Sequence, residues 1–310
     1  MELVEGELID FVHRDSGQKI ISPCFDAFTG RCFLRGRSSG DQAAGENTVR
    51  NGIMEIDPVT GAYDADDVFN AGGGSFTDRW EIDVNGNAYI VPGSEDRVRK
   101  YDLDFNLLES YVASAEFNSQ LFGVNSRGDV VFADNSPIQI EYWSADKSTY
   151  IQFQTTDFEF TGSQLREVRL VQDRVYAIDS DNLLVAFDIN SETVEWKKSV
   201  FGYRTMSIDF VGNIVIGGES AGSGRVRKLD PADGSTIWDV GVSNSSGTAP
   251  DITQIGVLSN MYYYAFAGVL GQLYILKTDG TVLDNVISGG RGNLGIHPFN
   301  NEYIQNFDLS

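Results

Sequence analysis

The sequence has few cysteines and histidines, which limits the metal and redox chemistry it can support. Its 310 residues include two cysteines and two histidines, His13 and His297. Cys24 and Cys32 lie on either side of a Phe-Thr-Gly turn, and the expected pairing of Cys24 with Arg35 would put the cysteines on opposite faces of a hairpin. Neither a Cys-x-x-Cys motif nor a Cys/His cluster is present. We therefore expect free thiols, no bound cofactor and little His-based acid–base catalysis.

Long apolar runs and lysines are also scarce. No run approaches the roughly 20 apolar residues that cross a bilayer. The first ten residues, MELVEGELID, are acidic and lack the basic and apolar regions of a secretory signal. The net charge is −22, with only seven lysines, and such a surface repels nucleic acid and anionic membranes. We expect a virion or cytoplasmic location, no nucleic-acid partner and no membrane insertion. The Asp-rich, Lys-poor balance also fits adaptation to high salt.

Short runs of strand-forming residues are abundant, and the stretch from Trp80 to Val112 shows their arrangement. Four such runs are separated by turn sequences: Trp80–Val84, Ala88–Pro92, Val98–Asp102 and Leu107–Val112. Val, Ile, Tyr and Trp favour the pleat, while the Asn, Gly and Asp between the runs supply the backbone angles of tight turns. This stretch is predicted to form an antiparallel four-stranded meander.

The same pattern recurs along the chain at intervals of roughly 40 to 55 residues, the period of propeller blades. Matching first hairpins are found at Cys24–Leu34, Leu121–Ala133, Val168–Ile178, Met206–Ile216, Ile255–Phe266 and Leu294–Phe307. No helical periodicity of comparable length competes with them. The sequence predicts an all-β fold, a seven-bladed β-propeller of four-stranded antiparallel blades in a single domain spanning residues 1–310.

The two ends of the chain are predicted to share the last blade. The hairpin at Leu294–Phe307 has no second hairpin after it, whereas Leu8–Arg14 and Gln18–Ser22 form a hairpin with none before it. Pairing segments 1–23 and 294–310 completes a blade and removes the open edges of a linear array.

Several segments resemble known propeller repeats. The sequence GSEDRVRKYDLDFNLL resembles a WD-type blade, and Ala186–Trp196 and Asp230–Trp238 resemble quinoprotein (PQQ)-like repeats with the pattern Ala-x-Asp-x-x-Thr-Gly-x-x-x-Trp. In that family the Trp docks onto the neighbouring blade, which implies this role for Trp196 and Trp238. The quinone-dependent enzymes resemble eight-bladed rings that often carry a vicinal cysteine pair, and this sequence lacks both features. The resemblance therefore implies the fold and not the cofactor.

The longer predicted loops all fall on one face of the propeller, and one of them is acidic. The segment Asp64–Arg79 carries the only weak metal candidates, which could bind calcium through carboxylate oxygens: Asp64, Asp66, Asp67 and Asp78. The DxDxDG spacing of a calcium loop is absent, so a solvated loop without metal is expected. Segments Thr155–Glu167 and Gly217–Gly224 are predicted to be further loops of this face.

Aromatic residues also gather in these predicted loops. They either fill the junctions between blades or form a recognition surface, since aromatic residues dominate interface hot spots. The candidates for an interaction face are Phe69, Phe76, Phe117, Phe158, Phe160, Phe201 and Tyr203.

These features favour a non-catalytic scaffold that binds other proteins through the long-loop face and that can form homo-oligomers. A more specific hypothesis is a virion structural protein, such as a tail or surface protein of a tailed virus. Two alternatives remain open at this point. One is a carbohydrate- or peptide-binding receptor module, and the other is a hydrolase or lyase with a carboxylate-lined channel.

Overall fold

In the computed structural model of the chain, backbone contacts define two compact units. One unit comprises Met1–Ser110 with Ser288–Ser310, and the other comprises Tyr111–Ile287. The structure describes residues 9–10, 18–25, 32–38, 51–56, 63–69, 80–83, 85–91, 97–113, 121–135, 138–209, 211–220, 222–243, 250–252, 254–259, 262–267, 272–287, 294–296 and 303–305.

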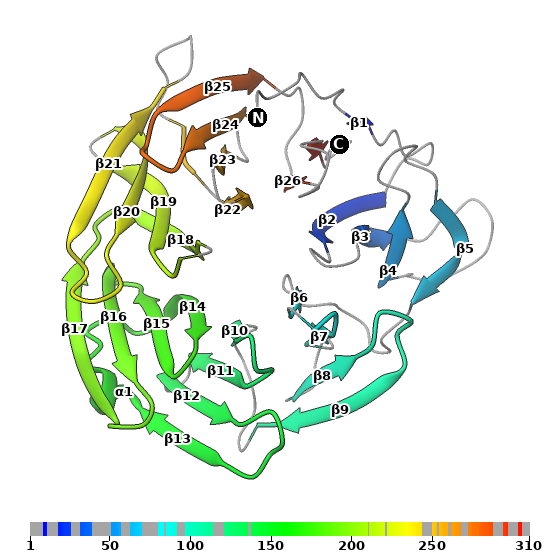
Figure 1. The fold of residues 1–310 in the computed structure, drawn as a ribbon, viewed down its shortest axis with the longest axis horizontal. Helices are drawn as coiled ribbons and strands as arrows, with labels where there is room; N and C mark the ends of the chain where they lie inside the picture. The colour runs from blue at the N-terminus through cyan, green and yellow to red at the C-terminus, as the bar shows by residue number, and fades with distance from the viewer. Residues whose placement is uncertain are drawn as a thin grey trace. The chain divides into compact units, whose positions relative to one another are not determined.

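The unit Tyr111–Ile287 contains four sheets, each made of four sequential strands (Figure 1). The first sheet has β10 (Leu121–Val124), β11 (Val130–Asn135), β12 (Ile138–Trp143) and β13 (Tyr150–Gln154). The second has β14 (Leu165–Val171), β15 (Arg174–Asp179), β16 (Leu183–Asp188) and β17 (Thr193–Ser199). The third has β18 (Tyr203–Ile208), β19 (Ile214–Ser220), β20 (Ser223–Leu229) and β21 (Thr236–Val242). The fourth has β22 (Gln254–Ser259), β23 (Tyr262–Ala267), β24 (Gln272–Lys277) and β25 (Val282–Ile287).

The other unit contributes two more four-stranded sheets and one three-stranded sheet. One sheet has β2 (Gln18–Phe25), β3 (Cys32–Ser38), β4 (Asn51–Ile56) and β5 (Tyr63–Phe69). A second has β6 (Trp80–Ile82), β7 (Ala88–Ile90), β8 (Arg97–Tyr101) and β9 (Leu107–Val112). A three-stranded sheet has β1 (Ile9–Asp10), β27 (Tyr303–Gln305) and β26 (Leu294–Ile296). Among the described residues the strands thus form seven sheets, consistent with the seven predicted blades. No helix in the described part of the chain is long and apolar enough to cross a membrane.

The N-terminal strands differ from the prediction in one respect. Strand β1 joins the sheet of the C-terminal strands, but it runs parallel to β27, with Ile9 opposite Ile304. Residues 18–22, expected to complete that sheet, instead belong to β2 in the next one. A β-bulge between Ile20 and Ser22 allows β2 to continue through Pro23 to Phe25. Such an irregularity relieves the loss of a backbone donor at proline, so the strand does not end where the sequence suggested.

The hairpin that carries the cysteines has a different register from the one predicted. Cys24 pairs with Phe33, and Phe25 pairs with Cys32. The prediction of Cys24 opposite Arg35 was wrong, because β2 and β3 pair in a register shifted by two residues from the expected one. The cysteines occupy adjacent cross-strand pairs and do not lie directly opposite each other.

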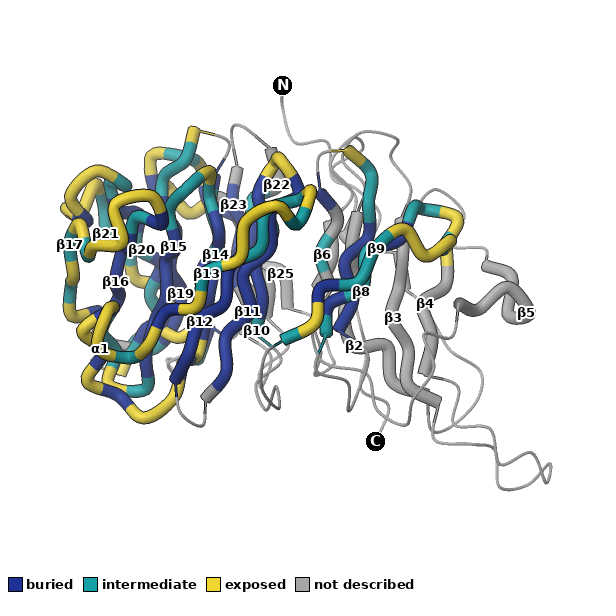
Figure 2. The backbone as a smooth tube through the Cα atoms, turned by 90° about the horizontal axis from the view of Figure 1, so that it is seen from below, coloured by how far each residue is buried: buried dark blue, intermediate teal, exposed yellow. Residues whose placement is uncertain are grey.

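The core of the unit Tyr111–Ile287 lies between sheets, and the middle strands of a sheet contribute to both of its faces. In β15 and β16 the runs Val175–Asp179 and Leu184–Phe187 are buried at every position, whereas the outermost strand β17 alternates with exposed residues. Val175 and Phe187 pack with residues of sheet β10–β13, and Tyr176 packs with residues of sheet β18–β21. Figure 2 shows the buried middle strands between exposed edges. Strands covered on both faces have continuous apolar runs, as this sequence does.

The glycine-rich segment Gly217–Gly224, predicted to be a loop, lies mostly within strands. Strand β19 extends to Ser220 and β20 begins at Ser223. A Cβ on Gly218 would lie 2.1 Å from the Gly202 carbonyl oxygen, and one on Gly224 would lie 2.4 Å from that of Pro250. These glycines allow close approach of neighbouring backbone, a role that the sequence pattern does not distinguish from that of a flexible loop.

Candidate functional site

The first part of the predicted acidic loop, residues 64–69, is a strand. Asp64, Asp66 and Asp67 lie in β5, the outermost strand of its sheet, so their assignment to a loop was wrong. Asp is unfavourable in strands, but an edge strand pairs on one side only and tolerates it. Asp78 lies outside the described residues. Among the residues that the structure describes, no group of three or more His, Cys, Asp or Glu is placed to hold a metal ion.

The predicted aromatic face separates into buried and exposed members. Phe158 and Phe160 stack with ring centroids 5.1 Å apart and are buried beside Phe187. Phe158 belongs to the short helix α1 (Thr155–Phe158), which interrupts the predicted loop Thr155–Glu167, and β14 begins at Leu165. These two rings fill the junction between sheets, so a place on a recognition surface is wrong for both.

Tyr203 and Phe201 differ sharply although they are two residues apart. Tyr203 is buried at the start of β18, whereas 73% of Phe201 is exposed. Only Phe201 can therefore contact a partner without unfolding. Phe69 lies in β5, and the remaining candidates, Phe76 and Phe117, lie outside the described residues.

Two tryptophans link neighbouring sheets in the same way. Trp196 in β17 donates its indole N–H to the Pro231 carbonyl oxygen at 3.0 Å, in the turn before β21. Trp238 in β21 donates to the Thr278 carbonyl oxygen at 2.9 Å, in the turn before β25. The implied docking of Trp196 and Trp238 onto the next blade is confirmed. In each case an indole ring on the outermost strand of one sheet is hydrogen-bonded to the last turn of the next sheet. We call this arrangement the tryptophan staple.

Glycines complete both staples. Gly234 has φ +68° and Gly280 has φ +90°, and a Cβ on either would meet the tryptophan ring at 2.7 Å and 3.0 Å, respectively. Each glycine thus supplies a left-handed turn and a flat surface for the indole. Tyr111 at the end of β9 makes a similar contact that the sequence reasoning missed, since its hydroxyl donates to the Ala145 carbonyl oxygen at 3.3 Å. Its position, nine residues after Asp102 and close to the Trp position of the other repeats, is the signal that could have revealed it.

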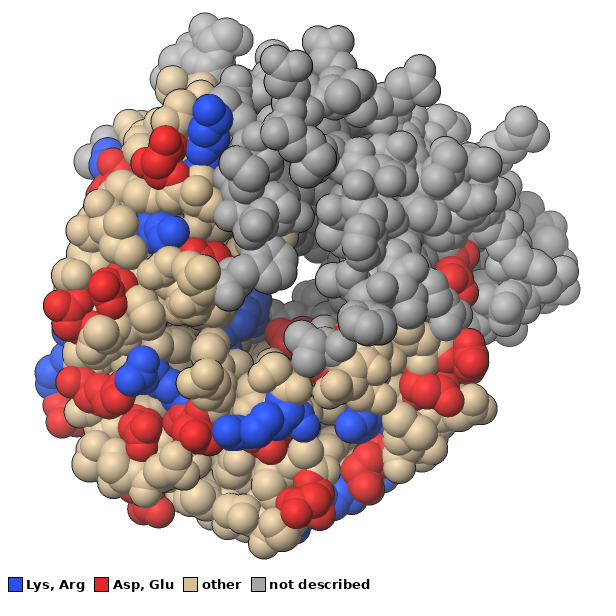
Figure 3. Space-filling model, viewed as in Figure 1, with Lys and Arg blue, Asp and Glu red and all other residues tan. Residues whose placement is uncertain are grey.

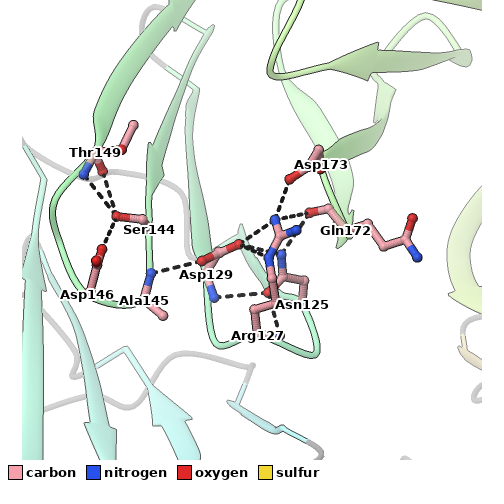
Figure 4. Close-up of polar contacts among 9 residues, drawn as sticks. All are labelled: Asn125, Arg127, Asp129, Ser144, Ala145, Asp146, Thr149, Gln172 and Asp173. Carbon is pink, nitrogen blue, oxygen red and sulfur yellow. Dashed lines mark hydrogen bonds and ion pairs between the residues drawn. The ribbon is translucent and has the colours of Figure 1, made fainter.

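A polar network joins the first turns of sheets β10–β13 and β14–β17 (Figure 4). Arg127 donates from Nε to Asp129 at 2.8 Å and from Nη2 to the Gln172 carbonyl oxygen at 3.2 Å. Its Nη2 also pairs with Asp173. Asn125 donates to the same Gln172 oxygen at 2.7 Å. The two turns are therefore held by a guanidinium, an amide and two carboxylates, which we call the Arg127 clip.

The charged groups of the Arg127 clip stabilise one another. Hydrogen bonds from Arg127 lower the pKa of Asp173, and Asp173 and Asp129 in turn raise the pKa of Arg127. Asp129 is buried and also accepts the backbone N–H of Ala145 at 2.9 Å. Burial, together with the charge of Asp129, raises the pKa of Tyr142 to about 12. The lowered pKa makes Asp173 a weak proton acceptor near neutral pH, and the raised pKa values make Arg127 and Tyr142 weak proton donors.

Replacing Arg127 with glutamine should lower the free energy of unfolding by about 1–2 kcal/mol at pH 7, mainly because buried Asp129 loses a charged donor. Asp173 has a lowered pKa in the folded state. Its contribution is therefore present above its unfolded pKa of about 3.9 and is lost as the pH falls through the folded value. Urea unfolding of both proteins at a series of pH values measures this. The difference in free energy of unfolding between the unsubstituted chain and Arg127→Gln should become smaller below about pH 4.

The control for this prediction is Lys197→Gln, since Lys197 pairs with Glu159 and both side chains are about half exposed. An exposed pair of this kind contributes about 0–1 kcal/mol. Two results would contradict a structural role for the clip. One is that Arg127→Gln lowers the free energy of unfolding by no more than Lys197→Gln does. The other is that the loss caused by Arg127→Gln stays unchanged down to pH 3.

A buried polar triad connects sheets β18–β21 and β22–β25. The Tyr263 hydroxyl donates to Asp209 Oδ2 at 2.8 Å, and Lys228 Nζ lies 2.9 Å from the Tyr263 oxygen and 3.1 Å from Asp209 Oδ2. Burial and Asp209 raise the pKa of Tyr263 well above its usual value. Burial alone would raise the pKa of Asp209, but its hydrogen bonds from Asn213, Tyr263 and Lys228 lower it. The triad therefore holds a buried ion pair with a protonated tyrosine.

Asp209 also closes the first turn of its sheet. Its Oδ1 accepts the backbone N–H groups of Val211 and Asn213 at 3.0 and 2.8 Å. Asp83 closes the corresponding turn of its own sheet and accepts the Tyr89 hydroxyl at 3.0 Å. The turn at residues 85–87 was expected from the sequence, but the closing role of the aspartate was not. Its signal is the shared sequence Asp-x-x-Gly-Asn at 83–87 and 209–213.

A cluster that contains two arginines lies on the face of sheet β18–β21 that packs toward sheet β14–β17. Asp239 accepts Arg225 Nε at 2.9 Å, Arg227 Nη2 at 2.6 Å and the Tyr203 hydroxyl at 3.0 Å. The Arg227 guanidinium lies 4.6 Å from the centre of the Tyr203 ring. Hydrogen bonds from the two arginines lower the pKa of Asp239 although burial opposes this, and burial raises that of Tyr203 to about 12. We call Tyr203, Arg225, Arg227 and Asp239 the arginine cluster.

These features, sequential four-stranded antiparallel sheets with staples between them, define a β-propeller, and comparison with known proteins agrees. A family model described as outer membrane protein assembly factor BamB matches residues 142–240, about a third of the chain. This segment includes both staple tryptophans. No curated protein matches the sequence.

Two solved structures show the same fold. A crystal structure of BamB from Moraxella catarrhalis matches with a TM-score of 0.51 and 14% identity, over 89% of this chain and 78% of that chain. A chain in the crystal structure of the mitotic checkpoint complex matches with a TM-score of 0.67 and 10% identity, over 99% of this chain and 98% of that chain. At such identities the likeness concerns the fold alone. The chain has a β-propeller fold of the PQQ-like and WD-like type, as predicted.

Proposed function

We propose that this chain is a non-catalytic scaffold that binds another protein through the connection between β17 and β18. The observation that carries the proposal is the exposure of Phe201 on a firmly held segment. Val200 N–H donates to the Asn182 carbonyl oxygen at 2.7 Å, and Glu219 N–H donates to the Gly202 carbonyl oxygen at 3.0 Å. Phe201 is therefore anchored on both sides while 73% of its own surface meets solvent.

An exposed aromatic ring on a rigid connection fits the physics of protein recognition. Aromatic side chains bury a large area at small entropic cost and are enriched in hot spots. A segment held by backbone hydrogen bonds loses little further freedom on binding, which favours affinity. The neighbouring Arg204 is about half exposed and pairs with Asp251, so a polar rim accompanies the ring. The propeller fold supports such a role, because its loops present side chains on a rigid frame.

Site-specific photocrosslinking tests the proposal directly. Val211 offers a matched control, because it is an exposed apolar residue (80%) at the opposite end of β18 from Phe201. A photoreactive phenylalanine analogue at position 201 should crosslink to one defined protein in the source cells, and the same analogue at position 211 should not. Equal labelling at both positions, or none at either, would count against the proposal.

We further propose that the scaffold is a structural component of a virus particle. Its support is compositional: the acidic, Lys-poor surface and the lack of recognisable catalytic motifs in the sequence. Mass spectrometry of purified particles from the source tests this, and intact particles that lack the chain would rule out the virion role while leaving the scaffold role open.

A further inference from the structure

The arginine cluster carries more positive charge than its own carboxylate neutralises. Arg225 and Arg227 share the single carboxylate of Asp239. Lys198 lies near enough for Arg227 to lower its pKa, together with the effect of burial. Counting these four groups, three cations face one anion. The exposed Asp233 also acts on Lys198, and the local sum stays positive even when it is included. In a chain of net charge −22, this excess is unusual.

The cluster also has hydrogen-bond donors to spare. A guanidinium has five N–H donors. Arg227 uses two of them on Asp239, from Nε and Nη2. Arg225 uses Nε on Asp239 and lies within hydrogen-bonding reach of the Tyr203 hydroxyl. Within the described part of the chain, the remaining N–H groups of both arginines have no acceptor, and 30% of Arg225 and 20% of Arg227 remain exposed.

The donors are held in place before any ligand arrives. The Arg227 guanidinium lies over the Tyr203 ring, and both arginines are fixed by Asp239. Lys198 Nζ is held by the Gly234 carbonyl oxygen at 2.6 Å and by Thr236 Oγ1 at 3.0 Å. Fixed guanidinium groups lose little entropy when they bind a planar or tetrahedral oxoanion in two-pronged fashion.

We propose that Arg225 and Arg227, supported by Lys198, form a binding site for an oxoanion, a carboxylate or a phosphate group carried by a ligand. Figure 3 shows Lys and Arg side chains interspersed with Asp and Glu on the visible face of the described residues. The arginine cluster has more cations than carboxylates, so an anion gains electrostatic energy there.

Nuclear magnetic resonance of the arginine side chains in the full chain tests the site. Inorganic phosphate and glutarate are titrated separately at constant ionic strength, and the Nε–H signals of Arg225 and Arg227 are followed. We expect saturable shifts with a dissociation constant in the millimolar range, on the order of 1–10 mM. The probe that binds more tightly identifies phosphate or carboxylate as the source of the oxoanion.

Variants sharpen the test. Asp239→Asn removes the internal competitor and should tighten binding by about 3–10-fold, whereas Arg225→Gln should weaken it by about 10-fold or more. Arg204→Gln is the matched control, because Arg204 is exposed, belongs to the same sheet and pairs with a different carboxylate, Asp251. It should leave binding unchanged. The absence of saturable shifts in the unsubstituted chain, or equal losses in the Arg225 and Arg204 variants, would overturn the proposal.

Discussion

Replacing Asp209 with alanine is expected to lower the free energy of unfolding by about 3–5 kcal/mol, the cost of leaving one member of a buried ion pair without its partner. The substitution leaves Lys228 in a buried position where its remaining contact is the Tyr263 hydroxyl. It also removes the acceptor of two backbone N–H groups in the turn, those of Val211 and Asn213. Urea unfolding followed by tryptophan fluorescence measures the loss.

Asp102 provides a matched control for this prediction. Its side chain closes a turn in the same manner, with Oδ1 accepting the N–H groups of Asp104 and Asn106 at 3.0 and 2.8 Å. These bonds lie at exposed positions, so Asp102→Ala should cost only about 0.5–1.5 kcal/mol. The additional loss of free energy of unfolding in Asp209→Ala, compared with Asp102→Ala, then measures the contribution of the buried triad. Equal losses at the two sites would show that the turn, and not the triad, accounts for the stability.

The triad also predicts a pH dependence. Its hydrogen bonds lower the pKa of Asp209 in the folded state. The stabilisation is therefore fully present above the unfolded pKa of about 3.9 and is lost as the pH falls through the folded value. The difference between the unsubstituted chain and Asp209→Ala should accordingly shrink only in acid and stay constant between pH 6 and 8.

Replacing Trp238 with alanine should lower the free energy of unfolding by about 2–4 kcal/mol, somewhat less than for a fully buried tryptophan. The half-buried ring packs against Gly280 and lies 6.0 Å from the Tyr263 ring, and its N–H bonds to the next sheet. Removing it opens the junction between sheets β18–β21 and β22–β25. Urea unfolding or calorimetry measures the loss.

Two further variants separate the parts of the staple. Trp238→Phe keeps an aromatic ring but removes the bond to the Thr278 carbonyl oxygen, and the loss of that bond alone should cost about 1 kcal/mol. Ile237→Ala, at the adjacent position that is 48% exposed, should change stability by less than about 1 kcal/mol. If Trp238→Ala destabilised the chain no more than Ile237→Ala does, the staple would not hold the sheets together.

Local signals sufficed for strands β7 to β9, but not for β5 or for the full length of β19. Strand β9 spans the predicted Leu107–Val112, and β7 and β8 lie within one or two residues of their predicted bounds. These runs could be found because β-branched and aromatic residues favour strands, and the Asn, Gly and Asp residues between them favour turns. Trp196 and Trp238 could be assigned because the segments around them resemble quinoprotein-like repeats, in which this Trp docks onto the neighbouring blade.

Burial could not be predicted in the same way. Asp209 and Asp102 close similar turns. The bonds of Asp102 within its turn are exposed, whereas Asp209 is buried and contacts Tyr263 and Lys228. Phe158 and Phe201 both follow the last strand of a sheet, yet one is buried and the other is exposed. In each pair the sequence environment is comparable, and the difference comes from residues on other strands, such as Tyr263 at 54 positions from Asp209, or from how the connection bends.

The sequence by itself determined the repeated meander, its turns and the docking tryptophans, because these depend on contacts within about a dozen residues or on a repeated spacing. Only the tertiary structure decided three other features. They are the pairing of β1 with β27, the close backbone approach at Gly218, and the gathering of Arg225 and Arg227 around one carboxylate. Each depends on which sheet face or strand lies opposite, and side-chain period specifies a face without specifying its neighbour. The buried triad and the excess positive charge of the arginine cluster both depend on which strands and sheet faces the tertiary structure brings together.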